Sequence, residues 1–111
     1  MNALERLAEL HDVDLLIEAC RDPHHGPALG RMGFPRVDPE GLLDARRRIA
    51  EGCEARGLHA YDRARARYGR GMVAVRERAC QGCFIRLPTS AAAAPHAVQV
   101  CESCGRVLYW R

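Results

Sequence analysis

The stretch that decides the fold is Cys80–Cys104, which begins C-Q-G-C and ends C-E-S-C with seventeen residues between the two pairs. Two C-x-x-C pairs at this spacing are typical of a structural metal site. Each C-x-x-C turn directs two sulfur atoms at one ion, and two such turns complete a tetrahedron of thiolates. Because the protein then fills all four positions, the pattern predicts a structural Zn²⁺ rather than a catalytic metal. The predicted ligands are Cys80, Cys83, Cys101 and Cys104.

Three other interpretations of these cysteines are open. Two disulfides would suit a secreted chain, but the polar, charged N-terminus carries no secretory signal. A redox pair needs one C-x-x-C at a strand-to-helix junction rather than two facing pairs. Iron or an iron–sulfur cluster also binds four cysteines, although paired turns favour zinc. We expect Gly82 and Gly105 to supply the positive φ angles that such turns often need.

The charge of the chain is unevenly distributed. All 17 basic residues among the 111 are arginine. Residues 1–43 hold four arginines and eight acids, a net of −4, whereas residues 44–111 hold thirteen arginines and six acids, a net of +7. A basic half of this kind suits phosphate or an acidic protein surface, although charge runs usually face solvent. No apolar run reaches membrane-spanning length, so we expect a cytoplasmic protein without a membrane partner, in which zinc thiolates persist.

Two helices are expected before the cysteine pairs. Asn2 is suited to cap a first helix over residues 3–20. Its apolar face recurs every three or four positions and comprises Leu4, Leu7, Leu10, Val13, Leu16, Ile17 and Cys20. The second helix begins with Asp38 as N-cap and Pro39 at the first helical position. We expect a kink or break near Gly57, where glycine weakens a helix, and a stop at Gly69 or Gly71.

The connection between these helices, about residues 21–37, is rich in glycine and proline. His24 and His25 lie there without a third ligand nearby, so we interpret them as solvated. Cys20 and Cys53 fall on apolar helix faces outside any C-x-x-C pair. We therefore expect both to be small core residues rather than metal ligands.

β-forming residues flank both cysteine pairs, which predicts three or four short antiparallel strands around the ion. A unit of about 40 residues is too small to be held by hydrophobic burial alone. Metal binding, worth on the order of 10–16 kcal/mol in small zinc modules, would hold it. The expected fold is therefore α+β: a short antiparallel helical hairpin over residues 1–70, followed by a small antiparallel β zinc ribbon over residues 71–111.

Arginines cluster with tyrosines just before the ribbon and within it. Basic residues interleaved with aromatic ones suit phosphate contacts and base stacking. The alternative is that Tyr61 and Tyr68 pack in the core while the arginines are solvated. By their spacing Arg63, Arg67 and Arg70 share one helix face. Phe84, Tyr109 and Trp110 could add base stacking, or could equally form the ribbon's own small core. The candidate nucleic-acid contacts are Arg63, Arg67, Arg70, Arg76 and Arg78.

Several motifs carry a resemblance to a known bacterial family. They are G-M-V-A-V (71–75), F-I-R-L-P (84–88), C-E-S-C-G-R-V-L-Y-W (101–110), A-Y-D-R-A-R-A-R-Y-G (60–69) and L-x-x-L-x-x-L-H-x-V-D (4–14). The chain resembles a family that joins a helical hairpin, often a long coiled coil, to a C-terminal four-cysteine zinc ribbon. The resemblance implies that the four cysteines are zinc ligands, and that the role is regulatory or adaptor with presumed nucleic-acid binding. A Gly/Pro-rich loop here replaces the far end of the family's coil.

A second resemblance is to small bacterial RNA-polymerase secondary-channel regulators, which join a helical hairpin to a similar four-cysteine finger. Those regulators depend on acidic residues at the coil tip, where this chain carries only Asp22 and Asp38. The sequence has no evident Ser/His/Asp or Cys/His arrangement and no phosphate-cradling glycine loop. We therefore do not expect an enzyme. We therefore expect a zinc-stabilised, non-enzymatic regulatory module that binds RNA or DNA. The alternative is a protein–protein adaptor, for example one associated with RNA polymerase, that docks a partner through its helices.

Overall fold

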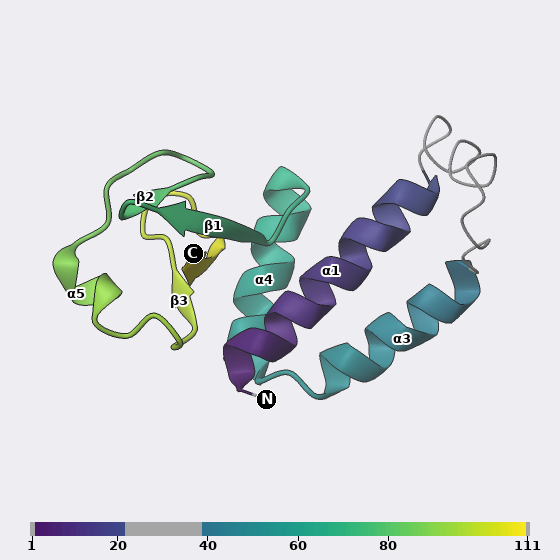
Figure 1. The fold of residues 1–111 in the computed structure, drawn as a ribbon. Helices are drawn as coiled ribbons and strands as arrows, with labels where there is room; N and C mark the ends of the chain where they lie inside the picture. The colour runs from purple at the N-terminus through teal and green to yellow at the C-terminus, as the bar shows by residue number, and fades with distance from the viewer. Residues whose placement is uncertain (1, 22–38, 111) are drawn as a thin grey trace.

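A computed structural model describes residues 2–21 and 39–110, which form helices and one four-stranded sheet (Figure 1). The helices are α1 (Ala3–Arg21), α3 (Pro39–Glu51), α4 (Ala55–Tyr68) and the short α5 (Thr89–Ala92). The strands are β1 (Met72–Arg76), β2 (Ala79–Cys80), β3 (Gln99–Val100) and β4 (Val107–Trp110). The predicted α+β class is confirmed. The Gly/Pro-rich loop, apart from Arg21, lies outside the described residues together with His24 and His25.

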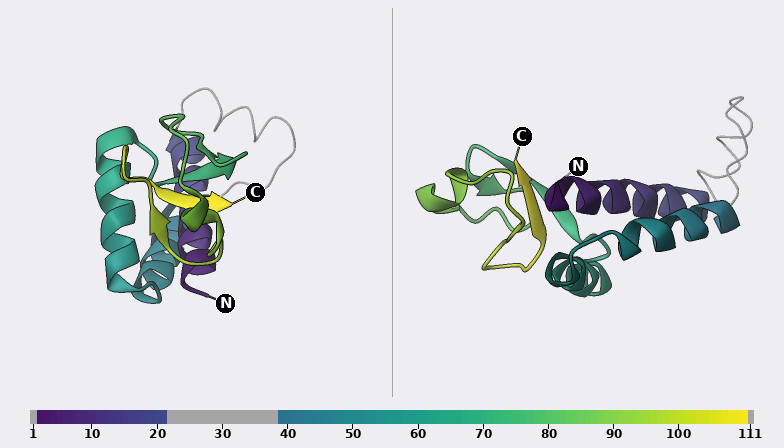
Figure 2. Two further views of the ribbon diagram at one scale, coloured as in Figure 1. Left: turned by 90° about the vertical axis from the view of Figure 1, so that its left-hand side faces the viewer. Right: turned by 90° about the horizontal axis from the view of Figure 1, so that it is seen from below.

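The helices α1 and α3 run side by side in opposite directions, and α4 turns away to lie against the sheet (Figures 1 and 2). The N-terminus of α1 is capped as expected, because the Glu5 backbone N–H donates to Asn2 Oδ1 at 2.8 Å. The helix α4 ends at its C-cap, Gly69, which has a φ of 84° and donates its N–H to the Arg65 carbonyl. This confirms one of the two predicted stops.

The break in the second helical segment was predicted near the wrong glycine. It falls at residues 52–54, where the Gly52 and Cys53 N–H groups bond three residues back and Arg6 Nη1 donates to the Gly52 carbonyl at 2.9 Å. Gly57 instead lies inside α4 and is buried. A Cβ there would lie 3.0 Å from Leu7 Cδ1, so Gly57 allows α1 to pack closely against α4.

The sheet is mixed, so the predicted purely antiparallel ribbon is wrong. Its order is β2-β1-β4-β3, with antiparallel outer pairs and a parallel central pair in which Met72 is opposite Val107. Each cysteine pair lies beside one antiparallel pair of strands. The strands β1 and β4 are parallel, and each is antiparallel to its outer partner. The two outer strands, β2 and β3, therefore also run in the same direction.

One buried cluster joins the helices to the sheet. It contains Leu4, Leu7, Leu10, Tyr61, Met72 and Val107. A second cluster surrounds the cysteines on the other part of the sheet. Thus apolar residues from both sides of the predicted boundary at residue 70 pack together, and the division into two domains stays a prediction. Among the described residues, no helix has both the length and the apolar character to cross a membrane.

The apolar face of α1 was predicted correctly only in part. Leu4, Leu7, Leu10 and Ile17 are buried, but Leu16 is 50% exposed. The buried positions between them are polar, namely His11 and Asp14. The buried face of α1 therefore includes His11 and Asp14 but not Leu16, so a charged side chain lies in the interior.

Candidate metal centre

Two turns of nearly identical backbone geometry hold the four cysteines. We call Cys80–Ile85 the first knuckle and Cys101–Arg106 the second knuckle. In the first knuckle, the Phe84 N–H donates to the Cys80 carbonyl and the Cys80 N–H donates to the Ile85 carbonyl. The second knuckle repeats both bonds at the matching positions, from Gly105 to Cys101 and from Cys101 to Arg106. The same local spacing therefore gives the same hydrogen-bonded turn in both knuckles.

The fifth residue of each knuckle has a positive φ, at 63° for Phe84 and 81° for Gly105. The expectation for Gly105 is confirmed, whereas the one for Gly82 is wrong, because Gly82 is not among the residues with positive φ. Gly82 instead lies close against the side chain of Arg106. A Cβ at this position would lie 2.5 Å from Arg106 Nη1 and 3.1 Å from Arg106 Cδ. The side chain from the second knuckle thus crosses closely over the first.

The sulfur atoms converge at distances that suit one ion. Cys80 Sγ lies 3.8 Å from Cys104 Sγ, Cys83 Sγ lies 3.7 Å from Cys101 Sγ, and all four lie within 4.8 Å of one another. A tetrahedron with metal–sulfur bonds of about 2.3 Å has edges of about 3.8 Å. All six cysteines of the chain are free, so the disulfide interpretation is wrong. The four cysteines fit a single tetrahedral metal ion.

The surroundings of the thiols explain why a cation would be favoured there. Burial raises the pKa of Cys101 to about 12 and also raises the pKa of Cys80. The backbone N–H of Ile85 lowers the pKa of the more open Cys83 to about 7. Burial opposes thiolate charge, and a bound dication offsets that cost when the ligands lose their protons. With four sulfur ligands, no position remains for a reacting water.

Cys20 and Cys53 stand apart from this group. Among the described residues, the only cluster of three or more potential metal ligands is the four-cysteine one. Cys53 is half-buried, packs at the edge of the helix–sheet cluster and donates to the Ile49 carbonyl at 3.3 Å. Cys20 is also half-buried, but it is not among the side chains packed against either cluster.

The structure does not bring the predicted arginines together. Arg63 and Arg67 line a hollow beside the second knuckle. Arg70 follows the end of α4 and lines a different cavity, next to α1, so the predicted shared helix face is wrong. Arg76 and Arg78 lie at the turn between β1 and β2, where Arg78 Nη1 donates to Thr89 Oγ1. Four of the five are exposed, and Arg78 is half-buried.

Tyr61 and Tyr68 pack within the protein, as the alternative interpretation of the arginine and tyrosine cluster predicted. Tyr61 is fully buried in the cluster between helices and sheet. Tyr68 is half-buried, and the Arg106 guanidinium lies 3.9 Å from the centre of its ring. Their rings are therefore engaged inside the protein. Phe84, by contrast, is 72% exposed.

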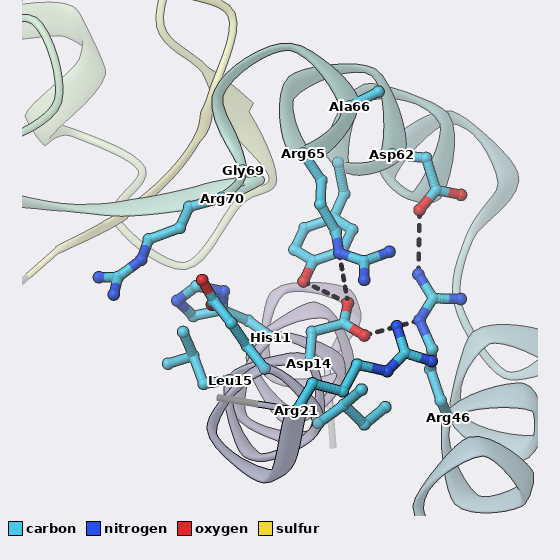
Figure 3. A pocket seen from close by; sticks show the side chains of 13 residues that line it. His11, Asp14, Leu15, Arg21, Arg46, Asp62, Arg65, Ala66, Gly69 and Arg70 are labelled. Carbon is cyan, nitrogen blue, oxygen red and sulfur yellow. Dashed lines mark hydrogen bonds and ion pairs between the residues drawn. The ribbon is translucent and has the colours of Figure 1, made fainter. Parts of the chain in front are cut away.

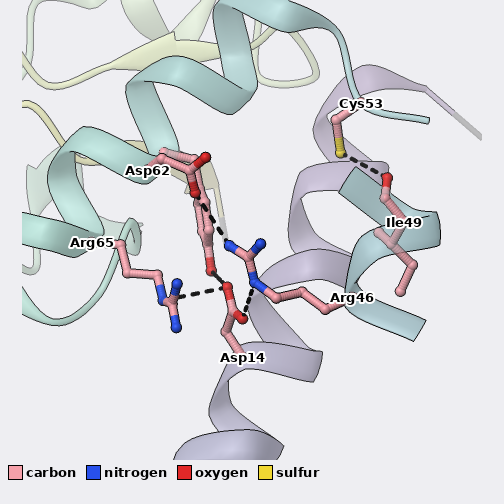
Figure 4. A network of polar contacts seen from close by, with 7 residues as sticks. Asp14, Arg46, Ile49, Cys53, Asp62 and Arg65 are labelled. Carbon is pink, nitrogen blue, oxygen red and sulfur yellow. Dashed lines mark hydrogen bonds and ion pairs between the residues drawn. The ribbon is translucent and has the colours of Figure 1, made fainter. Parts of the chain in front are cut away.

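A polar network that the sequence did not predict is centred on Asp14 and lies between three helices (Figure 4). The Asp14 carboxylate accepts hydrogen bonds from Tyr61 Oη and Arg46 Nε, both at 2.7 Å, and lies 3.5 Å from Arg65 Nε. Arg46 Nη2 also donates to Asp62 at 3.2 Å. Burial and the bond to Asp14 raise the pKa of Tyr61. One signal was present, since Asp14 lies seven residues after the buried Leu7.

The fold and the four-cysteine group define a metal-binding α+β protein, and two solved structures are similar to it. One is CT398 from Chlamydia trachomatis, with a TM-score of 0.55 and 27% identity, covering 66% of this chain and 33% of that one. The other is HP0958 from Helicobacter pylori, with a TM-score of 0.54 and 27% identity, covering 66% and 32%. The chain thus spans about a third of each. No protein-family model and no curated protein matches it.

Proposed function

We propose that this protein is a zinc-stabilised, non-enzymatic regulatory module that binds single-stranded nucleic acid through one edge of its sheet. Four buried or half-buried thiolates in tetrahedral spacing support zinc as the metal, because Zn²⁺ accepts this ligand set without redox change. Membership of the bacterial helical-hairpin and zinc-ribbon family is likewise our proposal, and it rests on the sequence motifs.

The proposed binding surface lies beside the first knuckle, and we call it the arginine edge: Arg76, Arg78, Phe84 and Arg86. Ala79 pairs with Arg86 in an antiparallel bridge, and the Leu87 N–H donates to the Arg78 carbonyl. These contacts place the segment after the first knuckle alongside β2. Arg76 and Arg86 line one hollow of about 510 Å³, in which Glu77 is the only acidic residue. The backbone thus gathers charges that are up to ten residues apart.

The exposed Phe84 is the observation that carries the proposal. An aromatic ring offers every base a stacking face, and neighbouring arginines offer contacts to phosphates. The ring lies 72% exposed on a residue with positive φ, a conformation that costs roughly 1–3 kcal/mol in a residue other than glycine. Because Tyr61 and Tyr68 are engaged within the fold, Phe84 replaces them as the stacking candidate.

The test compares two double variants of the zinc-loaded protein. Arg76→Ala/Arg86→Ala removes two exposed arginines from the arginine edge, and Arg47→Ala/Arg48→Ala removes two from the exposed side of α3. Binding of single-stranded RNA and DNA is measured by fluorescence anisotropy over a series of salt concentrations. We expect the first variant to bind more weakly and to lose roughly 0.7 unit of salt slope per phosphate contact. The second variant should match the wild type.

Equal binding by both variants would reject the arginine edge and favour a protein–protein adaptor. One observation favours that second candidate. Ile85 and Val100 are 44% and 42% exposed and line a hollow of about 380 Å³ together with the buried Leu108. Exposed apolar side chains at such a hollow suit contact with a partner's side chain. Loss of a co-purifying protein on Ile85→Ser, with RNA binding unchanged, would assign the adaptor role.

A further inference from the structure

A cavity of about 850 Å³ lies between α1, α3 and α4, on the helical part of the molecule (Figure 3). Four arginines line it: Arg21 from α1, Arg46 from α3, Arg65 from α4, and Arg70 from just after α4. Its acidic residues are Asp14, Glu18 and Asp62. Neither the metal centre nor the arginine edge shares a residue with this cavity. Such a concentration of arginine in a concave space needs its own explanation.

Asp14 fixes two of these arginines by their inner nitrogens. It is buried, lines the cavity and meets both Arg46 and Arg65 through their Nε atoms. Arginine has five N–H donors, four of them on the two terminal nitrogens. Within the part of the chain that the structure describes, Asp14 and Asp62 contact three arginine nitrogens, and the Nη groups of Arg65 are not among them. The buried carboxylate therefore orients guanidinium groups while leaving donors for a ligand.

The balance of charge also leaves the cavity positive. Asp14 contacts Arg46 and Arg65, and Asp62 contacts Arg46. The four arginines that line the cavity outnumber its three carboxylates, Asp14, Glu18 and Asp62, by one, so its net formal charge is +1. Burial lowers the pKa of His11, which packs edge-on against Tyr61 and lines the same cavity. The neutral imidazole therefore adds no repulsion toward the arginines.

We propose that this cavity binds a small phosphorylated molecule, with the Arg65 and Arg70 guanidinium groups donating to its phosphate oxygens. Planar, multidentate donors are suited to phosphate, and the volume falls within the roughly 300–1,000 Å³ that is usual for small-molecule sites. A concave space walled by three helices favours a compact ligand over an extended backbone. The site is independent of the proposed nucleic-acid surface, so either proposal can fail alone.

The experiment titrates inorganic pyrophosphate into the zinc-loaded full chain at low ionic strength and measures heat release by calorimetry. We expect saturable binding that weakens about tenfold in Arg65→Ala and in Arg70→Ala. Arg63→Ala is the matched control, because Arg63 lies on the same helix as Arg65 but lines another hollow. We expect its affinity to be unchanged. Circular dichroism and zinc content show that each variant remains folded.

Glu18→Gln supplies a change in the opposite direction. Glu18 is exposed and lines the cavity, so removing its charge should tighten pyrophosphate binding about twofold. A gain of affinity cannot come from a misfolded variant. Adenosine diphosphate, titrated beside pyrophosphate, identifies the source of the phosphate: tighter binding than pyrophosphate indicates a nucleotide, and equal binding indicates inorganic polyphosphate.

Two results would overturn the proposal. The first is binding that is the same in wild type, Arg65→Ala and Arg70→Ala. The second is no binding of either pyrophosphate or adenosine diphosphate at millimolar concentration. If Arg65→Ala then weakens the binding of an RNA oligonucleotide, the cavity is assigned to backbone phosphates instead.

Discussion

The two knuckles share a hydrogen-bonding pattern but place different residues at the position with positive φ. The second knuckle uses Gly105, for which a left-handed backbone costs little. The first knuckle uses Phe84, which is strained there by roughly 1–3 kcal/mol and leaves most of its ring in solvent. The fold gains little from this side chain, since an exposed ring contributes little burial. At this position, therefore, the first knuckle has an exposed aromatic side chain and the second knuckle has none.

The largest expected effect concerns whether the two knuckles bind the same metal ion. We expect Cys80→Ser, in the first knuckle, and Cys101→Ser, in the second, to lose zinc equally, because a structural site supplies folding free energy on the order of 10–16 kcal/mol. Metal analysis of the purified variants, with near-ultraviolet circular dichroism for packing, measures the effect. A full equivalent of zinc in either variant would contradict the shared four-thiolate site.

Gly105→Ala tests the backbone of the second knuckle. No atom lies within 4 Å of the position a Cβ would occupy, so the expected cost is the left-handed conformation alone, about 1–2 kcal/mol. Urea denaturation of the zinc-loaded protein measures the free energy of unfolding, and zinc content serves as the control. An unchanged free energy of unfolding would mean that the knuckle tolerates side chains here, and Phe84 would then need no functional explanation.

Phe84→Gly tests the backbone of the first knuckle at the matching position. Relief of strain stabilises the folded state, while added glycine freedom stabilises the unfolded chain, so we expect a net gain of about 0.5–1 kcal/mol. The same variant should bind RNA more weakly through lost stacking, worth about 1–3 kcal/mol per base. Thermal denaturation and anisotropy are measured on one preparation. A more stable protein with undiminished RNA binding would remove Phe84 from the proposed surface.

The smallest effect is expected for the two cysteines outside the knuckles. Cys20→Ala/Cys53→Ala should retain one zinc per chain, because neither sulfur lies in the four-cysteine group. Loss of the bond from Cys53 to the Ile49 carbonyl should cost about 1 kcal/mol or less. Metal analysis and urea denaturation check both points. Reduced zinc in the double variant would show that the site extends beyond the knuckles.

What the sequence could predict was what local spacing determines. Each C-x-x-C turn, the Asn2 cap and the positive φ of Gly105 depend on residues a few positions apart. The parallel pairing of β1 with β4 depends on how distant hairpins stack, and no local pattern encodes it. Asp14 was missed because its partners Arg46 and Arg65 come from two other helices, and Arg70 was misplaced because α4 ends two residues before it.

The parallel central pair also sets the order in which the sheet can form. Each knuckle closes over six residues and can form early, whereas Met72 must find Val107 thirty-five positions away. Closing that loop has an entropic cost that grows by about 0.6 kcal/mol for each doubling of its length. An ion captured by both knuckles bridges the chain first and shortens the remaining search. We therefore expect the rate of folding, as well as the final stability, to rise with metal concentration, which stopped-flow refolding at several zinc concentrations would measure.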